Sequence, residues 1–365
     1  MLEKGKISSF QLSVLLAGFV LGSSVIIIPG GDAGHDAWIA IALGLMEGLF
    51  IAWIFTALVT RFKDKTIIEI NDLVFGRILG KLISILFVWY FFHLGALVLN
   101  DYVHFFRLQL YPATPKTIML LILMLVCAST VNRGIEVLAR CSLILVPFTI
   151  GIILIDTMFL IPQIDLNNLM PILDVPIGNL LLAAHSAASF PFAETVAFVM
   201  ILAFLNKSEK GGPAVSKGLI LAGLVLIIAS VRNNAVLGPM TAAYNYPSYQ
   251  TVQAIDIGEI LTRVEILVAI NFITMGFLKI SVLLYGTVLG LSQVLNLKSY
   301  RPIILPVGIL MVLLALTNVG NTIELFEFSH NSYPIYAVPF QIIIPLIALM
   351  VVKLRKMPKA EGGKP

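Results

Sequence analysis

The first candidate for binding chemistry is the segment Gly22-Ser23-Ser24-Val25, which lies inside an apolar run from Phe10 to Ile28. A glycine and two serines followed by β-branched residues make a weak place for a continuous helix. Where a helix unwinds, its backbone N–H groups are free to bind a carboxylate and its C=O groups to bind an amine or a cation. We therefore expect these four residues to contact a small solute.

The second candidate is the segment Ala187-Ala188-Ser189-Phe190, directly before Pro191, in the apolar run from Ile177 to Leu205. Pro191 has no N–H, and its ring clashes with the carbonyl of Ala187, so this carbonyl is released from the helix. Glycine and proline also serve simply to pack or kink membrane helices. Because two such segments occur in one chain, we favour a ligand site that both of them line.

Lys279 is the first of three ionisable residues that accompany these segments. No other charged residue lies between Glu265 and Lys298. A lysine near the middle of a membrane costs about 2.5–3.5 kcal/mol, so it is expected to face a cavity or a partner. We expect its ammonium to contact the carbonyls freed near Gly22–Ser24 and to take the place of a sodium ion. The alternative is a long side chain that snorkels to the membrane surface.

Glu194 and His185 are the other two candidates for ion substitution or coupling. Glu194 lies one turn beyond the second segment, and three roles are open for it: a proton site, an acceptor for a ligand amine, or a structural partner of a helix N-terminus. His185 adjoins the same segment, and it is either a hydrogen-bonded packing residue or part of the site. No H-E-x-x-H, G-x-S-x-G or phosphate-binding G-x-x-x-x-G-K-[ST] motif occurs, so we expect no enzyme, no catalytic residue, no metal and no cofactor.

Composition decides the class of protein that carries these residues. The chain has 365 residues, of which 59% are hydrophobic and 12% charged, with a mean hydropathy of +0.98. A bilayer crossing takes about 20 apolar residues as a helix. A secreted, nucleic-acid-binding or ordinary cytosolic protein is therefore excluded. We predict an all-α integral membrane protein with ten spans, at Phe10–Ile28, Ala37–Thr60, Leu82–Phe105, Thr117–Val131, Cys141–Ile161, Ile177–Leu205, Leu219–Leu237, Ile260–Leu295, Ile303–Val319 and Ile335–Val352.

The distribution of positive charge predicts how the spans are oriented. With ten spans, nineteen of the 24 Lys and Arg residues fall on the side that also holds both termini. Cytoplasmic loops carry an excess of these residues, so both termini are expected in the cytoplasm. The inside loop 62–81 has apolar residues at helical spacing and is expected to lie along the interface, while the outside loop 238–258 is expected to cap the bundle.

The two interrupted segments lie about half a chain apart, in the first and sixth predicted spans. Five spans in each half give the halves opposite orientations, and matching broken helices in inverted repeats are typical of the LeuT-type transporter fold. We therefore predict a single transmembrane domain over residues 1–356. Its repeats cover about 7–161 and 177–353, and a disordered tail follows at 357–365.

Several motifs, in their order and spacing, resemble those of a known family. They are Ala33-Gly34-His35-Asp36-Ala37-Trp38, Gly76-Arg77-Ile78-Leu79-Gly80-Lys81, Arg133-Gly134-Ile135-Glu136-Val137-Leu138-Ala139-Arg140 and Phe190-Pro191-Phe192-Ala193-Glu194 followed by Asn206-Lys207. The chain resembles, over essentially its whole length, the spore germination permeases, which are the B subunits of nutrient germinant receptors in the amino acid–polyamine–organocation superfamily. The resemblance implies a ten-helix LeuT-type fold, recognition of a small nutrient such as an amino acid, and the inner membrane of the spore. It also implies assembly with a larger A-type membrane subunit and a C-type lipoprotein subunit.

Two functions from different classes fit these features. The first is a sensor that binds a small solute, with an amino acid expected, at the two breaks and relays binding to partner subunits. The second is a secondary permease that moves amino acids, coupled to protons. A scaffold without a ligand is a third possibility. The fold allows all of them, because function depends on the site rather than on the fold.

Overall fold

The computed structural model describes residues 2–3, 5–206, 209–255, 264–318, 324 and 327–357 as an all-α protein. Across these residues no strand forms, and extended chain pairs only in an isolated parallel bridge between Ile7 and Leu205. The predicted all-α class is therefore confirmed. The helices are α1 (Ser9–Ser24), α2 (Ala37–Val59), α3 (Ile67–Phe75), α4 (Arg77–Gln109), α5 (Lys116–Asn132), α6 (Ile135–Phe159), α7 (Ile177–Ala187), α8 (Gly211–Leu237), α9 (Pro247–Gln253), α10 (Glu265–Val294), α11 (Ile304–Thr317), α13 (Tyr333–Val338) and α14 (Ile344–Leu354).

Helix length and hydropathy support most of the predicted spans. In the described part of the chain, six helical segments are long and apolar enough to cross a membrane: Gly31–Val59, Arg77–Gln109, Ile135–Phe159, Gly211–Ala243, Glu265–Val294 and Phe328–Leu354. Three shorter apolar segments, Ser9–Ser24, Lys116–Asn132 and Arg301–Thr317, coincide with further predicted spans. The remaining span, 177–205, is a broken helix. The number ten stays a prediction.

Large apolar side chains cover the outside of the helices. Ile78, Ile144, Leu182 and Ile335 are each at least 70% exposed. A soluble protein rarely exposes extended apolar surface, whereas a helix in lipid satisfies its backbone internally and turns apolar side chains outward. The chain is therefore an integral membrane protein.

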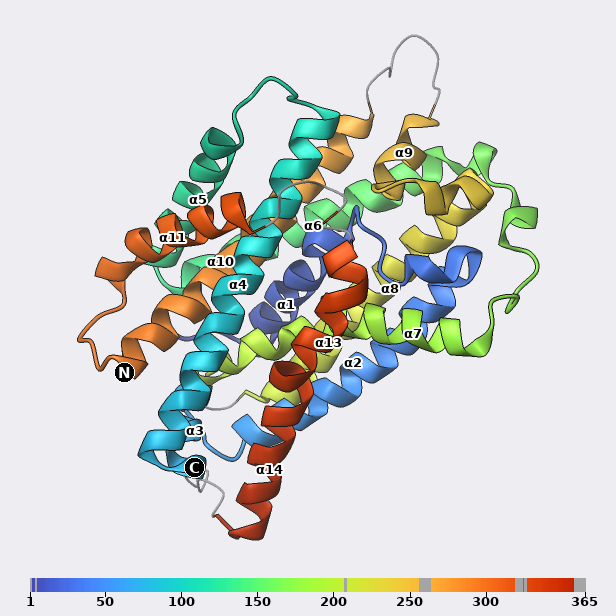
Figure 1. Ribbon diagram of the computed structural model, residues 1–365. Coiled ribbons are helices and arrows are strands. Elements are labelled where there is room, and N and C mark those ends of the chain that lie inside the picture. The colour runs from blue at the N-terminus through green and yellow to red at the C-terminus, as the bar shows by residue number, and fades with distance from the viewer. Residues whose placement is uncertain are drawn as a thin grey trace.

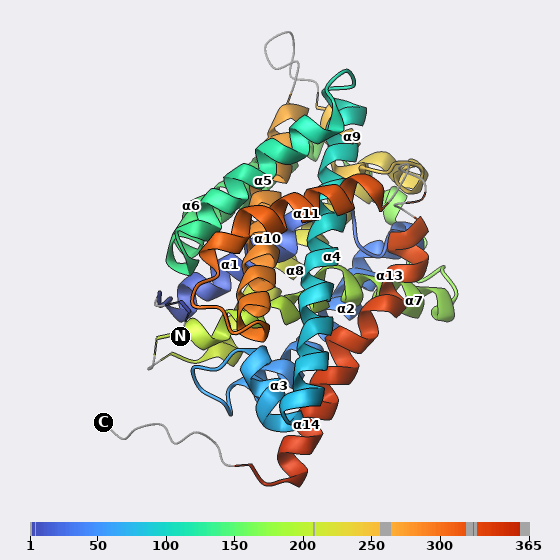
Figure 2. The same ribbon diagram turned by 60° about the vertical axis from the view of Figure 1, so that its left-hand side comes forward.

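Helix α1 lies inside the bundle rather than at its surface. It packs against α8, α10 and α6, and α10 in turn packs against α4 (Figures 1 and 2). Every residue from Leu12 to Ser24 is buried, as expected for a helix that is apolar on all sides. Helix α2 packs against α7 and α8, and α14 lies beside α2. The first predicted break is thus enclosed by protein, where unpaired backbone is tolerated.

The first break is confirmed, and the helix ends earlier than the predicted span. Gly22 has φ −9° and ψ −112°, outside the helical region, and α1 ends at Ser24 rather than at Ile28. The N–H groups of Ile26 and Ile27 both donate to the Ser23 carbonyl, at 3.3 and 3.1 Å. The chain then continues without helix to Gly30, which has a positive φ of 68°.

The second break is also confirmed. Helix α7 ends at Ala187 and passes through a π turn, Ala188–Phe192, into 3₁₀ turns at Ala193–Met200 and Leu202–Phe204. Phe190 inside this π turn is extended, with φ −131° and ψ 115°. A single straight helix is therefore replaced by a helix, an extended residue and a tighter coil.

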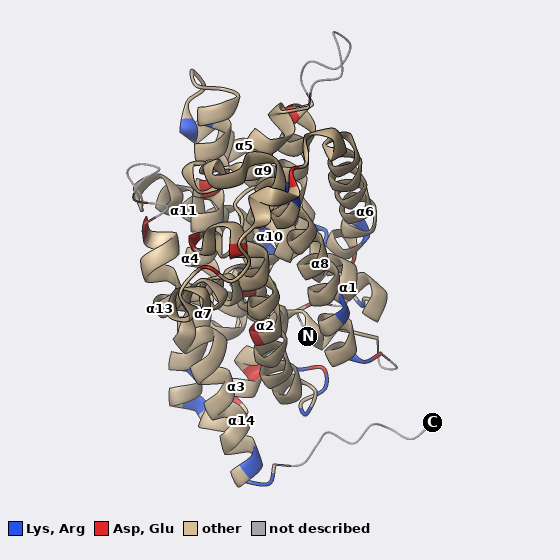
Figure 3. Cartoon of the chain, turned by 90° about the vertical axis from the view of Figure 1, so that its right-hand side faces the viewer, with Lys and Arg blue, Asp and Glu red and all other residues tan. Residues whose placement is uncertain are grey.

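Short helices form within the loops at both ends of the bundle. Helix α3 forms within the predicted interfacial segment and starts with a capping box of Thr66 and Glu69. On the opposite end, a 3₁₀ turn at Gly238–Ala243 and helix α9 occupy the predicted outer loop. Figure 3 shows Lys and Arg gathered near α3 and the end of α14. Residues 256–263 and 358–365, which include the start of the predicted eighth span and most of the predicted tail, lie outside the described residues.

Candidate functional site

The side chain of Lys279 lies across the first break. Lys279 is near the middle of α10 and is fully buried. A Cβ atom added to Gly22 would lie 2.5 Å from Lys279 Cδ and 3.2 Å from Lys279 Cβ. Glycine at position 22 therefore allows the lysine stem to rest directly on the interrupted turn of α1.

The ammonium of Lys279 forms an ion pair with Glu194, just beyond the second break. Lys279 Nζ lies 2.5 Å from Glu194 Oε2, and the two side chains are 0% and 1% exposed. The ammonium also lies 4.7 Å from the ring centroid of Phe190 and 5.4 Å from that of Phe19, within the range of cation–π attraction. The predicted contact with carbonyls near Gly22–Ser24 is not formed, since no hydrogen bond joins Lys279 Nζ to these carbonyls and its charge partner is Glu194 instead. A full negative charge attracts an ammonium more strongly than carbonyl dipoles do where the dielectric constant is low.

A buried hydrogen-bond chain connects Glu194 to the second break. The Tyr333 hydroxyl donates to Glu194 Oε1 at 2.8 Å, and the Tyr90 and Tyr333 hydroxyls lie 3.0 Å apart. Gln341 Nε2 donates to the Tyr90 hydroxyl and to the backbone carbonyl of Ser189, both at 2.9 Å. A side chain thus binds a backbone group at the break. The hydrogen bonds connect the break to α4 and to the last helical segment, Phe328–Leu354, called the last helix below.

A small cavity of about 50 Å³ lies beside the ion pair. Its polar lining residues are Asp101, Ser186, Glu194, Tyr246, Ser329, His330 and Tyr333. Burial raises the pKa of Tyr246, which lies in the loop before α9, and the nearby Asp101 carboxyl raises it further. The phenol therefore remains a hydrogen-bond donor at neutral pH. The volume holds a few water molecules and is smaller than the roughly 300–1,000 Å³ of most ligand pockets.

Most of the predicted ligand residues lie in the protein next to this cavity rather than on its surface. Phe190 lines it, together with Ile27–Gly30, which follow the first segment. The irregular chain after Ser24 reaches the cavity because α1 ends before the predicted span does. The other predicted ligand residues are buried in the adjoining protein, and their binding role stays a prediction: Gly22, Ser23, Ser24, Val25, Ala187, Ala188 and Ser189.

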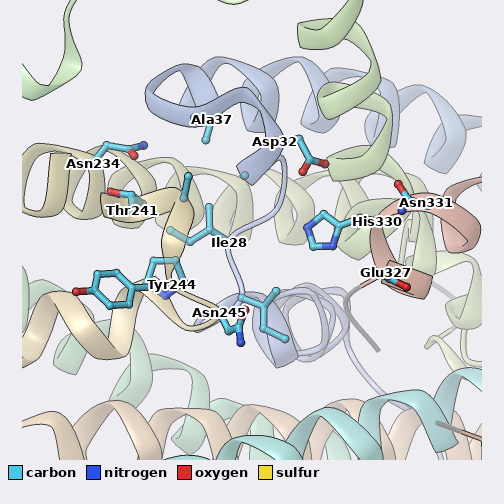
Figure 4. A pocket seen from close by; sticks show the side chains of 15 residues that line it. Ile28, Asp32, Ala37, Asn234, Thr241, Tyr244, Asn245, Glu327, His330 and Asn331 are labelled. Carbon is cyan, nitrogen blue, oxygen red and sulfur yellow. The ribbon is translucent and has the colours of Figure 1, made fainter. Parts of the chain in front are cut away.

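A second, larger cavity of about 510 Å³ lies next to the first, at the end of the bundle that carries the 3₁₀ turn after α8. Figure 4 shows Asp32, Glu327 and Asn331 around it, with Asn234 on α8. Three residues line both cavities and so separate them: Ile27, Ile28 and His330.

His185 lines neither cavity. Its Nδ1 is 2.8 Å from Glu47 Oε1 on α2, and each side chain is about one-third exposed. The pair ties α7 to α2 just before the second break. In the described part of the chain, no group of three His, Cys, Asp or Glu residues is arranged to hold a metal ion.

Helix α2 approaches the second break closely through a glycine. A Cβ atom on Gly44 would lie 2.8 Å from the Ala184 carbonyl oxygen and 2.9 Å from the Ala188 backbone nitrogen. These neighbours are backbone atoms and cannot turn away as a side chain does. The second break therefore packs directly against α2 at Gly44, where the helix has no side chain.

Sequence reasoning missed several groups of this site, among them Asp101, Tyr333 and Gln341. A signal for Asp101 was available, because a carboxylate inside a predicted span marks a functional site by default. Tyr333 and Gln341 gave none, since their roles depend on how the last helix packs against the second break.

Comparison with known proteins agrees with this architecture. A family model described as "Spore germination protein" matches residues 6–323. Spore germination protein KB of Bacillus subtilis strain 168 is 32% identical to the chain and aligns over the full length of both proteins. Spore germination protein XB of Bacillus anthracis is 25% identical over 94% of the chain and 97% of that protein.

Solved structures with a similar fold include a transporter. MhsT in complex with L-phenylalanine has a TM-score of 0.67, with 13% identity, and the match covers 96% of this chain and 99% of that one. Mhp1, a nucleobase-cation-symport-1 family transporter with bromovinylhydantoin bound, has a TM-score of 0.63 at 10% identity, covering 96% and 79% of the two chains. At these identities the similarity shows the fold, and the predicted LeuT-type fold is confirmed.

Proposed function

The chain belongs to the spore germination permease family, as its motifs predicted, and from this premise we propose that it is the solute-sensing B subunit of a nutrient germinant receptor. In this proposal it binds a small solute, an amino acid, at the membrane midplane. Binding is relayed to an A-type membrane subunit and a C-type lipoprotein subunit in the inner membrane of the spore. Both termini face the cytoplasm.

The observation that carries this proposal is the charged cavity between two broken helices. Buried ionisable groups inside a membrane are costly and mark functional sites. Here Lys279, Glu194 and Asp101 come from three different helical segments. An amino acid has one group of each charge, so a site with backbone N–H groups, carboxylates and a lysine matches its chemistry.

The access route in this proposal runs through the larger cavity. A solute enters the 510 Å³ space, and the partition formed by Ile27, Ile28 and His330 opens to admit it to the midplane. The 50 Å³ cavity then widens around the bound solute. Ligand pockets of hundreds of Å³ are the norm for small molecules, so binding requires this change of shape.

The relay in this proposal begins at the second break. Gln341 holds the Ser189 carbonyl, and Tyr333 holds Glu194. A solute that takes over either contact releases the last helix from the break. A ligand shifts a conformational equilibrium when it binds the two states unequally. The last helix, held or released, has two such states, and partner subunits would bind one of them in preference.

The test is equilibrium binding of radiolabelled amino acids to the purified full-length chain. Ser186→Phe fills the cavity that Ser186 lines and is expected to lower affinity by about tenfold or more. The matched control is Leu182→Phe on the same helix, whose side chain is 70% exposed toward lipid and which should bind as the wild type does. Equal affinities for all three proteins would contradict a midplane site.

The same assay tests the role of Lys279 as a substitute for sodium. Binding is expected to be equal in sodium and in N-methylglucamine buffer, because the Lys279 ammonium, paired with Glu194, already supplies a positive charge between the two breaks. Binding that needs sodium and is unchanged by Lys279→Met would end this idea.

A proton-coupled amino acid permease is the second candidate, favoured by the similarity of the fold to transporters. The purified chain alone, in proteoliposomes with an imposed proton gradient, distinguishes the two. Accumulation of labelled amino acid against its gradient would favour transport, and binding without accumulation would favour sensing.

A further inference from the structure

Asp101 is a buried carboxyl group without a cationic partner of its own. It lies on α4, is 8% exposed, and lines the 50 Å³ cavity. Within the described chain, no Lys, Arg or His side chain forms an ion pair with it. Lys279 attracts it only from a distance, and the Ser23 hydroxyl of the first break lies beside it.

The charge balance of the cavity leaves one carboxyl group uncompensated. Lys279 is engaged by Glu194 at 2.5 Å, and His330, the other basic side chain that lines the cavity, forms no ion pair with Asp101 in the described part of the chain. A buried carboxyl group without a paired cation is neutralised either by a proton or by a cation that binds beside it. The cavity therefore has room for one more positive charge, beside Asp101.

The surroundings of Asp101 suit an organic ammonium. The side chains of Tyr246, Tyr333 and Ser186 line the same space, and aromatic faces attract cations. The irregular chain of Ile27–Gly30 forms the adjacent wall. An ammonium there has a carboxylate, hydroxyl groups and a ring around it, with the rest of the solute directed toward the first break.

We propose that Asp101 accepts the protonated primary amine of the ligand, so that the site selects solutes with an ammonium group over their uncharged analogues. This assignment rests on the proposed midplane function and names the group that reads the amine. A small metal cation has the same charge, and the test separates the two.

The test compares matched pairs of probes on purified full-length protein. Glycine, L-alanine, L-valine and L-phenylalanine are each paired with the 2-hydroxy acid that has a hydroxyl in place of the amine. Wild-type protein is expected to bind an amino acid about thirtyfold or more tightly than its hydroxy acid, the lower range for loss of a buried charge partner. In Asp101→Asn this ratio falls to near one, and Asp101→Glu restores part of it.

Asp32→Asn is the matched control, because Asp32 lines the larger cavity and not the smaller. It should retain the wild-type ratio. If Asp101→Asn keeps the full preference for amines, or if Asp32→Asn is the variant that loses it, the assignment is wrong while the midplane site itself survives. If no probe binds the wild type, the proposed function and this inference both fail.

Two further readouts keep the test decisive. Affinity of Asp101→Asn for the hydroxy acid reports on folding, since an intact site binds it as well as the wild type does. Repeating the series in sodium and in N-methylglucamine separates an ammonium from a metal ion. If the wild type binds both amino and hydroxy acids only in sodium buffer, and Asp101→Asn loses affinity for both, Asp101 holds a metal ion. That result would overturn the proposal.

Discussion

At the scale of single residues, the charge balance of the site depends on the ion pair between Lys279 and Glu194. Both side chains are buried, so each charge depends on the other for compensation. Aromatic rings at 4.7 and 5.4 Å and the Tyr333 hydroxyl complete the surroundings. Such a pair adds little net stability when intact, but it penalises loss of either member.

This asymmetry gives a prediction for single and double variants. Lys279→Met and Glu194→Gln should each destabilise the protein by about 3–5 kcal/mol, because each leaves a buried group without its partner. The double variant should be more stable than the sum of the single losses predicts. Denaturant unfolding of the four proteins in one detergent measures the coupling, and additive losses would show that the two charges do not compensate each other.

Residue types predicted which ionisable residues belong to this site, but not which of them form pairs. Lys279 was identified because a lone charge in an apolar segment needs a partner, and Glu194 because it follows a break. Their pairing depends on the packing of α10 against the segment after α7, which sequence spacing does not encode. The carbonyls near Gly22 were expected to hold the ammonium, and the stronger carboxylate replaced them.

At the scale of elements, the second break is held from both sides. Gln341 donates to the Ser189 carbonyl on one side. On the other, Gly44 of α2 lets backbone meet backbone. The position of the break therefore depends on neighbours as well as on Pro191, which is why its existence could be predicted from sequence and its detailed path could not.

Close packing at Gly44 predicts a large effect for a small substitution. Gly44→Ala places a Cβ within 2.9 Å of two backbone atoms, so α2 must move and stability and solute binding should both fall. The matched control is Gly151→Ala in α6, where a Cβ meets nothing within 4 Å. That change should be neutral or stabilising by up to about 1 kcal/mol through helix propensity. Thermal unfolding of both variants checks the prediction, and similar losses for the two would refute it.

At the scale of the whole molecule, hydropathy and the two breaks predicted the fold class correctly. Apolar runs locate helices well, because lipid demands that backbone groups be satisfied within each segment. They located the ends less well. Helix α4 extends from Arg77 to Gln109, beyond the predicted 82–105, since protein outside the hydrocarbon layer also supports a helix. The inverted repeat over 7–161 and 177–353 stays a proposal.

Membrane orientation is a prediction that belongs to this scale. In a background with Cys127→Ala and Cys141→Ala, we expect a cysteine placed by Tyr244→Cys to react with a membrane-impermeant maleimide in intact cells. A cysteine placed by Ser299→Cys, in the turn between α10 and α11, should react only after permeabilisation. The reverse labelling pattern would invert the charge-based orientation.

The most direct test of the central claim is an experimental structure of the purified chain with a saturating amino acid that binds it. The account predicts solute density in a widened midplane cavity, with its ammonium at Asp101 and its body between the two breaks. Density confined to the larger cavity beside Asp32, or an unchanged midplane cavity, would contradict the claim that the broken helices form the binding site.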